Sequence, residues 1–394
     1  MDFKEFQGKN KFSREDIVAF AQGRLLADAP EGLGGIPCSL LLAFHEISHI
    51  FWDADAGTGR IEAIRRNRMD DWFYSCHFLG DPVMPGCWGI DAAWQCLKFF
   101  AAWRGLKGCD KTLGMENAAF FGQIRPYDQT IVYSVDILSI ETIDGETLVT
   151  GKASVSVDGT QVYSIGNVCV ATSYWASDAP TPLPAIGPAQ DAPLKRLAYD
   201  EFSAKDRFSR AEIVALSQGR LVDAPQLEVG LLPSALMLEI GRVDRLRFDE
   251  AAGEGSISAS RDNDPLEWFY PMTPGIKPAV LSIDAIWQLL GVFLTWRQNS
   301  GTGRALGFER VDVFGDITPE DRLVRYEVDI LRTTRSEING DAFVRADAKV
   351  YADGRLILAC TNANVGCHKR IRYDDYPLPG EMSRGGKLKV RGGS

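Results

Sequence analysis

The amino-acid sequence predicts an α+β protein made of two copies of one domain, each an antiparallel sheet curled around a long apolar helix. The first observation is a repeat: residues 11–26 (KFSREDIVAFAQGRLL) return at residues 207–222 (RFSRAEIVALSQGRLV) with ten of sixteen positions identical. Each copy also contains one helix-length apolar run, followed by segments in which apolar and polar residues alternate. A helix that is apolar on every side must be covered, and an antiparallel sheet that curls around it does so.

Length and composition are those of a two-domain soluble protein. The 394 residues suffice for two ordinary cores, and 45% hydrophobic with 24% charged residues is a typical globular balance. The net charge of −10 argues against nucleic acid as a partner. We find no apolar run of the roughly 18–20 residues that would span a bilayer, and the polar N-terminus is not a secretory signal. We therefore expect no membrane partner. Since the eight cysteines show no CxxC spacing, we also expect a reduced, cytoplasmic protein.

Local signals place the elements of each copy in order. Ser13 is expected to cap a helix over residues 11–26, with acidic residues in its first turn. Residues 38–52, and residues 234–248 in the second copy, are read as strands. After the central helix, period-two alternation predicts four strands. These strands are expected at residues 118–122, 130–140, 147–157 and 161–172.

Turn signals and composition complete this outline. The pairs Asp144-Gly145 and Asp158-Gly159 predict tight hairpins, and the second copy offers Asn339-Gly340 and Asp353-Gly354. A stretch rich in Pro and Ala reads as a linker between the halves. We therefore predict a first domain at 1–176, a linker at 177–193, a second domain at 194–377 and a flexible tail at 378–394.

The chemistry concentrates in residues 72–103 (WFYSCHFLGDPVMPGCWGIDAAWQCLKFFAAW), where a turn-rich segment leads into the apolar helix. Asp91 interrupts that helix, and burying a carboxylate is costly unless it is paired or hydrogen-bonded. Gln95 lies four residues later on the same face and can hold the carboxylate. Lys98 is expected to reach solvent along its own stem. His77, one of four histidines, precedes the helix.

The second copy keeps only part of this arrangement. Residues 268–296 (WFYPMTPGIKPAVLSIDAIWQLLGVFLTW) repeat the carboxylate and amide as Asp284 and Gln288. The segment is three residues shorter and has no histidine where His77 stands. Only one complete site can therefore be assembled from the two copies.

These motifs resemble the β-hydroxydecanoyl-acyl-carrier-protein dehydratase/isomerase family of hotdog-fold enzymes. The resemblance lies in CHFLGDPVMPGCWGIDAAWQ, LGMENAAFFGQIRP and SVDGTQVYSIGNVCVAT, and the tandem form is similar to dehydratase regions of polyunsaturated fatty acid synthases. It implies a double hotdog, packed as a pseudo-dimer, that acts on chains carried by acyl carrier protein without a cofactor. It also implies that each site combines the histidine of one hotdog with the helix aspartate of the other. His77 would then work with Asp284, and Gly86, with Cys87 beside it, would meet the thioester oxygen.

The residue types suit this reaction on chemical grounds as well. Removing water from a β-hydroxyacyl thioester needs a base for the α-proton, which a neutral imidazole at His77 supplies. It needs an acid for the departing hydroxyl, which an aspartic acid in an apolar helix supplies. The first amides of the helix near Gly86 can stabilise the enolate oxygen. We assign catalysis to Asp284, supported by Gln288, and a fold-maintaining role in a degenerate second site to Asp91 and Gln95.

Other interpretations remain open from sequence alone. Hotdog proteins also hydrolyse thioesters, so an acyl thioesterase is one alternative, and a catalytically silent scaffold that binds acyl carriers is another. His45 and His49 spell HExxH, the zinc-protease signature, but that site needs a helix and this stretch reads as a strand. We therefore expect no metal. Arg65, Arg66 and Arg68 are a basic cluster, either a solvated face or a docking point for an acidic carrier.

Overall fold

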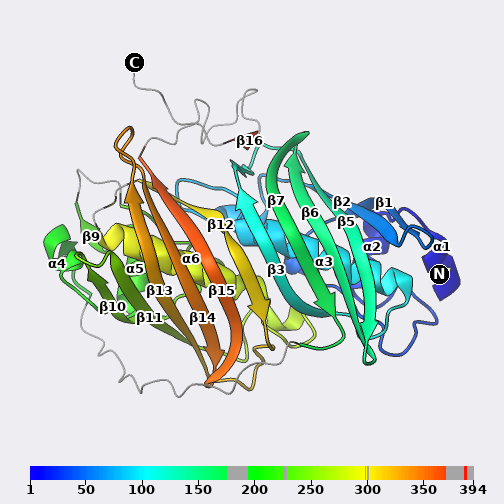
Figure 1. Cartoon of the computed structure of the whole chain (residues 1–394). Coiled ribbons are helices and arrows are strands. Elements are labelled where there is room, and N and C mark those ends of the chain that lie inside the picture. Colours follow the sequence, from blue (N-terminus) through cyan, green and yellow to red (C-terminus); the bar gives the residue numbers. More distant parts are fainter. Residues whose placement is uncertain (175–193, 225–228, 298, 300, 370–385, 388–394) are drawn as a thin grey trace.

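The computed structural model describes residues 1–174, 194–224, 229–297, 299, 301–369 and 386–387. Within these ranges, one continuous antiparallel sheet of twelve strands runs through both halves in the order β1-β2-β5-β6-β7-β3-β12-β15-β14-β13-β11-β10 (Figure 1). The first half contributes β1 (Glu46–Asp53), β2 (Thr58–Arg66), β3 (Lys111–Phe120), β5 (Thr130–Ile143), β6 (Glu146–Val157) and β7 (Thr160–Ala171). The second contributes β10 (Arg242–Asp249), β11 (Glu254–Asp262), β12 (Thr302–Val313), β13 (Leu323–Arg335), β14 (Ala342–Ala352) and β15 (Arg355–His368). The order reads the same from either edge, as expected of a duplicated domain.

Two long helices occupy one face of this sheet. In Figure 1, α3 (Gly86–Arg104) lies behind the strands of the first half and α6 (Ala279–Trp296) behind those of the second. A proline caps the start of each, and α3 ends at Gly105, whose left-handed backbone (φ 77°) suits a glycine. Most side chains of both helices are buried. This is the double hotdog that the sequence predicts, and the α+β fold class is confirmed.

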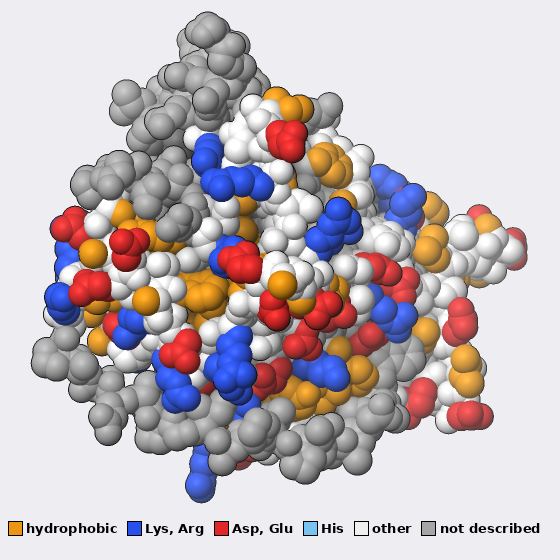
Figure 2. Space-filling view, turned by 60° about the vertical axis from the view of Figure 1, so that its left-hand side comes forward, with side chains coloured by type: hydrophobic (Ala, Val, Ile, Leu, Met, Phe, Trp, Pro, Cys, Tyr) orange, Lys and Arg blue, Asp and Glu red, His pale blue; other side chains and the backbone are white. Residues whose placement is uncertain are grey.

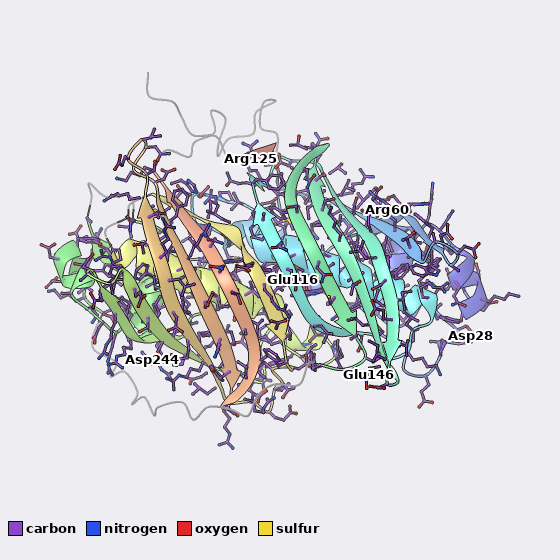
Figure 3. All side chains as sticks on the ribbon, viewed as in Figure 1. Asp28, Arg60, Glu116, Arg125, Glu146 and Asp244 are labelled. Atoms are coloured by element: carbon purple, nitrogen blue, oxygen red, sulfur yellow. The ribbon has the colours of Figure 1, made fainter. Side chains whose placement is uncertain are left out.

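The halves join through their sheets. β3 pairs with β12 over Gly114 to Ala119, with partners Asp312 to Gly307. The strands approach so closely that a Cβ on Gly307 would lie 1.9 Å from the Ala118 carbonyl oxygen. Figure 3 shows Glu116 at this junction on the open face of the sheet, where its carboxylate pairs with Arg310 at 3.0 Å. One core therefore spans both halves.

Shorter elements lie mainly around the two ends of the sheet and beside the core helices. They are α1 (Phe3–Gly8), α2 (Arg14–Ala21), α4 (Tyr199–Ser203), α5 (Arg210–Ser217), β8 (Leu197–Ala198), β9 (Val222–Asp223) and four 3₁₀ turns at Ser39–Leu41, Trp72–Ser75, Ala235–Met237 and Tyr270–Met272. Ser13 caps α2 as predicted, in a capping box with Asp16, but the helix ends at Ala21, five residues before the expected end. Ser209 caps α5 in the same way.

Three of the four strands predicted after the central helix are correct, and the Asp-Gly pairs form the expected hairpins. The strand expected at residues 118–122 is wrong in its bounds, because β3 begins at Lys111 and ends at Phe120. Both residues of Asp144-Gly145, Asp158-Gly159 and Asp353-Gly354 have positive φ, as a type I′ turn requires. The Asn339-Gly340 pair differs, since only its glycine has positive φ.

The strand expected at residues 38–52 is wrong over its first half, because β1 begins only at Glu46. Residues 41–43 instead give their backbone groups to the Gln95 side chain, which donates to the Leu41 carbonyl at 2.8 Å and accepts from the Ala43 amide at 3.0 Å. Gln288 does the same with Met237 and Glu239 in the second half. In each half, these backbone groups therefore bond to a glutamine side chain of the core helix and not to a neighbouring strand.

Two further expectations concern segments at the edge of the described residues. The linker at 177–193 lies outside them, as does the tail at 378–394 apart from β16 (Gly386–Lys387), which pairs with β4 (Gly122–Gln123). The expectation that no apolar run has spanning length needs correction. α6 has 18 residues with a mean hydropathy of 1.6, but 83% of it is buried inside the protein, as in the core helix of a soluble protein.

Candidate active site

His77 lies in the segment between the 3₁₀ turn Trp72–Ser75 and α3, facing the other half of the molecule. The second half fastens this segment, because the Ser234 amide donates to the Cys76 carbonyl oxygen at 2.8 Å. The rings of Trp72 and Trp268 also meet at 5.1 Å across the junction. The histidine is therefore held by contacts that neither half has alone.

Hydrogen bonding defines the tautomer of His77. Its Nδ1 lies 2.9 Å from the Val83 carbonyl oxygen, which can only accept, so Nδ1 carries the proton and Nε2 keeps its lone pair. Burial lowers the pKa of His77 to about 4, opposed by the hydrogen bond to Val83 and helped by the nearby Arg304 charge. At neutral pH this side chain is a neutral imidazole with one basic nitrogen.

Asp284 comes from α6 of the second half and is 4% exposed. Burial raises its pKa to about 7, against hydrogen bonds from Gln288 and the Cys87 thiol, which favour the ionised form. The Gln288 amide nitrogen donates to Asp284 Oδ2 at 2.6 Å, and the backbone contacts of Gln288 fix its own position. A carboxyl group with this pKa carries a proton much of the time at neutral pH.

His77 and Asp284 line one cavity of about 80 Å³ between the halves. Its walls come from both halves and are mainly apolar or aromatic. They include Phe78, Val83, Met84, Gly86, Phe120, Tyr163, Leu231, Leu232, Pro233, Trp287, Gly291, Arg304 and Val365. A basic imidazole and a protonated carboxyl group thus face the same enclosed, apolar space, an arrangement suited to acid–base chemistry.

Gly86 and Cys87 occupy different positions around this cavity. Gly86 lines it and begins α3, so its N–H lies in the first turn, where helix amides lack an intrahelical acceptor. A Cβ here would come within 3.0 Å of the Phe120 ring, which explains the glycine. Cys87 is fully buried and does not line the cavity; its thiol hydrogen-bonds to the Asp284 carboxyl group. Burial raises the pKa of Cys87 well above its usual range, so it is not a nucleophile.

Two residues at the cavity were missed by the sequence reasoning. Arg304, from the second half, bonds Asp81 at 2.7 Å and Gln123 at 2.6 Å in the first half, and so ties the histidine segment to β12. Trp287 Nε1 is a buried donor with no hydrogen-bond partner among the described residues. The repeat offered a signal for Trp287, since the same IDA-x-WQ motif holds Trp94. Nothing in the sequence near Arg304 distinguished it from other surface arginines.

The structure does not bring Asp91 to a histidine. Asp91 accepts from Gln95 at 2.6 Å, as Asp284 does from Gln288, and burial raises its pKa to about 6. It faces a second, larger cavity, where Thr273 stands at the position of His77. The described part of the chain therefore contains one pairing of histidine with helix aspartate.

The remaining candidate motifs are engaged in other contacts. His45 accepts from the Arg66 amide at 3.2 Å, and the His49 ring packs against Phe51 at 5.2 Å, on a strand as expected. The basic cluster is neutralised, since Arg65 pairs with Asp71, Arg66 with Glu46 and Arg68 with Asp70. Figure 2 shows charges of both signs mixed over the face in view. All three arginines of this cluster are thus engaged in ion pairs.

Comparison with known proteins places these features in a family. The family model described as a FabA-like domain matches the chain twice, over residues 36–166 and 232–361. Among solved structures, the dehydratase domain from the CurJ module of the curacin polyketide synthase is 12% identical, covers 83% of this chain and 98% of its own, and has a TM-score of 0.48. A dehydratase domain of a mycocerosic acid synthase-like polyketide synthase is 15% identical over 81% of this chain and 93% of its own, with a TM-score of 0.47. A trans-AT polyketide synthase dehydratase domain from Brevibacillus brevis is 10% identical over 83% and 98%, with a TM-score of 0.47.

Proposed function

The chain belongs to the family of FabA-like domains, and from that premise we propose that it dehydrates β-hydroxyacyl thioesters to enoyl thioesters. The observation that carries the proposal is the presence in one cavity of a neutral His77 and an Asp284 that is partly protonated at neutral pH. The two groups come from opposite halves and have pKa values shifted in opposite directions. Environments that push two titratable groups apart in this way are typical of acid–base pairs.

We propose one role for each group. His77 Nε2 takes the proton from the carbon next to the thioester carbonyl, because its other nitrogen is committed to Val83. The electrons of that bond form the carbon–carbon double bond, and the β-hydroxyl departs as water with the proton of Asp284. The Gly86 N–H, in the first turn of α3, stabilises negative charge on the thioester oxygen. Gln288 and Cys87 hold the carboxyl group in place.

Finer features of the reaction form part of the proposal. We infer that the acyl chain arrives on an acyl carrier protein in the cytoplasm, as one step of a fatty acid or polyunsaturated fatty acid synthase. The same base can take a proton from C4 of the trans-2 enoyl product while a proton is added at C2, which moves the double bond to C3, so trans-2 to cis-3 isomerisation is a natural extension. The apolar walls beyond Asp284, including Leu231, Leu232 and Gly291, support an aliphatic substrate.

The test is incubation with a series of β-hydroxyacyl thioesters, followed by mass spectrometry of the products. Loss of one water with the thioester intact is the expected result, and the double-bond position shows whether isomerisation occurs. Free acid would indicate a thioesterase, and unchanged substrate a silent scaffold; either would contradict the proposal. Activity should survive dialysis against a strong chelator, since the proposed roles use side chains and an amide alone.

A further inference from the structure

A second cavity is larger than the one that holds His77. It has a volume of about 810 Å³ and lies at the pseudo-symmetric position, between α3 and the loop that precedes α6. Asp91 and Trp94 line it where Asp284 and Trp287 line the first cavity. Two wall residues are smaller than their counterparts: Val313 replaces Phe120, and Leu358 replaces Tyr163, at matching positions of the central strands.

This second cavity lacks the means for the dehydration proposed at the first. Thr273 replaces His77, and its hydroxyl donates to the Ile276 carbonyl oxygen at 2.6 Å and accepts from the Ile276 amide at 3.2 Å. The Thr273 hydroxyl is therefore occupied by hydrogen bonds within its own loop. No imidazole lines the cavity, so the α-proton would have no base comparable to His77.

A lysine distinguishes the second cavity from the first. Lys98 lines it at the position where Gly291 lines the first, seven residues after the helix aspartate and so two turns along the same helix face. The Lys98 side chain is half-buried and lines this cavity between the halves. Within the described residues it makes no hydrogen bond or ion pair, whereas every other lysine of the cavity is paired: Lys111 with Asp316 at 3.8 Å and Lys277 with Glu239 at 2.6 Å.

The charges around Lys98 determine what it can attract. Burial lowers its pKa, Asp91, Asp110 and Asp316 oppose that shift, and Lys111 adds to it. None of these aspartates forms an ion pair with Lys98: Asp316 is engaged by Lys111 and by the Tyr174 hydroxyl at 2.5 Å, Asp91 accepts from Gln95, and Asp110 lines the cavity beside them. An ammonium group that lines a cavity can donate a strong, charge-assisted hydrogen bond to an anionic ligand.

We propose that the second cavity is a non-catalytic binding site for an aliphatic carboxylate, with Lys98 as the counter-ion of the carboxylate group. The hydrocarbon chain lies against Leu25, Leu26, Ile36, Trp94, Met272 and Ile317, which line the cavity. Its volume is in the range of ordinary small-molecule sites, about 300–1,000 Å³. The proposal does not depend on the reaction performed at His77.

The test is isothermal titration calorimetry of the full chain at neutral pH, with decanoate as the anionic probe and decanol as its uncharged match. Lys98→Met keeps the length and apolar stem of the side chain but removes the ammonium group. We expect it to weaken decanoate binding roughly 10- to 100-fold, the value of one charge-assisted hydrogen bond. Lys98→Arg should stay close to the wild type, which separates a loss of charge from a failure to fold.

Matched controls locate the site. Lys111→Met removes a paired lysine from the same cavity and should change the affinity less than Lys98→Met. Decanol should bind more weakly than decanoate and be indifferent to Lys98→Met, and turnover at the His77 cavity should be unaffected by that variant. Undiminished decanoate affinity in Lys98→Met, equal affinity for decanol, or no decanoate binding by the wild type would each overturn the proposal.

Discussion

At the scale of single residues, two identical helix aspartates have been given different surroundings. Asp284 shares its cavity with a basic imidazole and accepts a hydrogen bond from the Cys87 thiol, whereas Asp91 has Val280 and Thr273 at the corresponding positions. Both keep the supporting glutamine at 2.6 Å. The shared glutamine maintains the loop before each first strand, and the histidine alone decides which aspartate is in a position to do chemistry.

The first prediction compares these two aspartates. Asp284→Asn keeps the shape of the side chain but removes the transferable proton, so turnover should fall roughly 10²- to 10⁴-fold. His77→Ala should be at least as severe, and the double variant little worse than either one, because the two groups act together. Asp91→Asn should retain most of the turnover. The measurement is turnover at matched folded fraction; an inactive Asp91→Asn beside a near-normal Asp284→Asn would show that the site is built within one half.

The second prediction concerns pH. The base must be unprotonated and His77 has a pKa of about 4, while the acid must be protonated and Asp284 has a pKa of about 7. The value of kcat/KM should therefore be level between these two limits, fall as pH rises through about 7, and fall again toward pH 4. In Asp284→Asn, the residual activity should lose the decline on the alkaline side. Persistence of that decline would assign it to another group.

At the scale of elements, features that depend on residues close together in the chain were predicted correctly, and features that depend on distant contacts were not. The apolar helix, the Asp-Gly hairpins and the Ser13 cap were predicted from sequence because each depends on residues close together in the chain. The false strand before Glu46 arose because Gln95, more than fifty residues away, binds that backbone. Arg304 was missed for a similar reason, since its partners Asp81 and Gln123 belong to the other half.

A third prediction addresses α6 as the wall of the first cavity. Gly291 lines the cavity, and a Cβ there would meet only Leu232 Cδ2, at 3.8 Å. Gly291→Leu should leave the helix intact, because glycine is about 0.8–1 kcal/mol less favourable in a helix than alanine and leucine ranks close to alanine. Its side chain would fill space used by the acyl chain, so activity on long substrates should fall more than on short ones. Chain-length profiles and thermal melting check this together.

A glycine on the other core helix provides the control. A Cβ on Gly89 of α3 would lie 2.2 Å from the Tyr163 ring, so Gly89→Ala should lower the melting temperature, unlike Gly291→Leu. A uniform loss of activity of Gly291→Leu across chain lengths would mean that α6 does not set the substrate length.

At the scale of the whole molecule, the junction between the halves makes the site possible. The β3–β12 pairing, the Trp72–Trp268 contact and the Arg304–Asp81 ion pair all cross it, and His77 meets the cavity of Asp284 only there. The sequence predicted a pseudo-dimer of two hotdogs through the repeat and the family resemblance. The sequence could not predict that the two cavities differ in volume. Phe120 lines the first cavity and Val313 the second, and each cavity takes its shape only after both halves have folded.

The last prediction separates the halves. Residues 1–176, the predicted first domain, would expose the whole β3 edge, whose backbone groups from Gly114 to Ala119 pair with β12 in the intact chain. Unpaired sheet edges recruit other chains, and the apolar surface facing α6 would be uncovered as well. The fragment should therefore self-associate or precipitate, and it should lack dehydratase activity because Asp284 is missing. Size-exclusion chromatography with light scattering, with the full chain as control, measures this. A soluble, monomeric and stable first half would show that the junction contributes little to folding, and would contradict a single core shared by both halves.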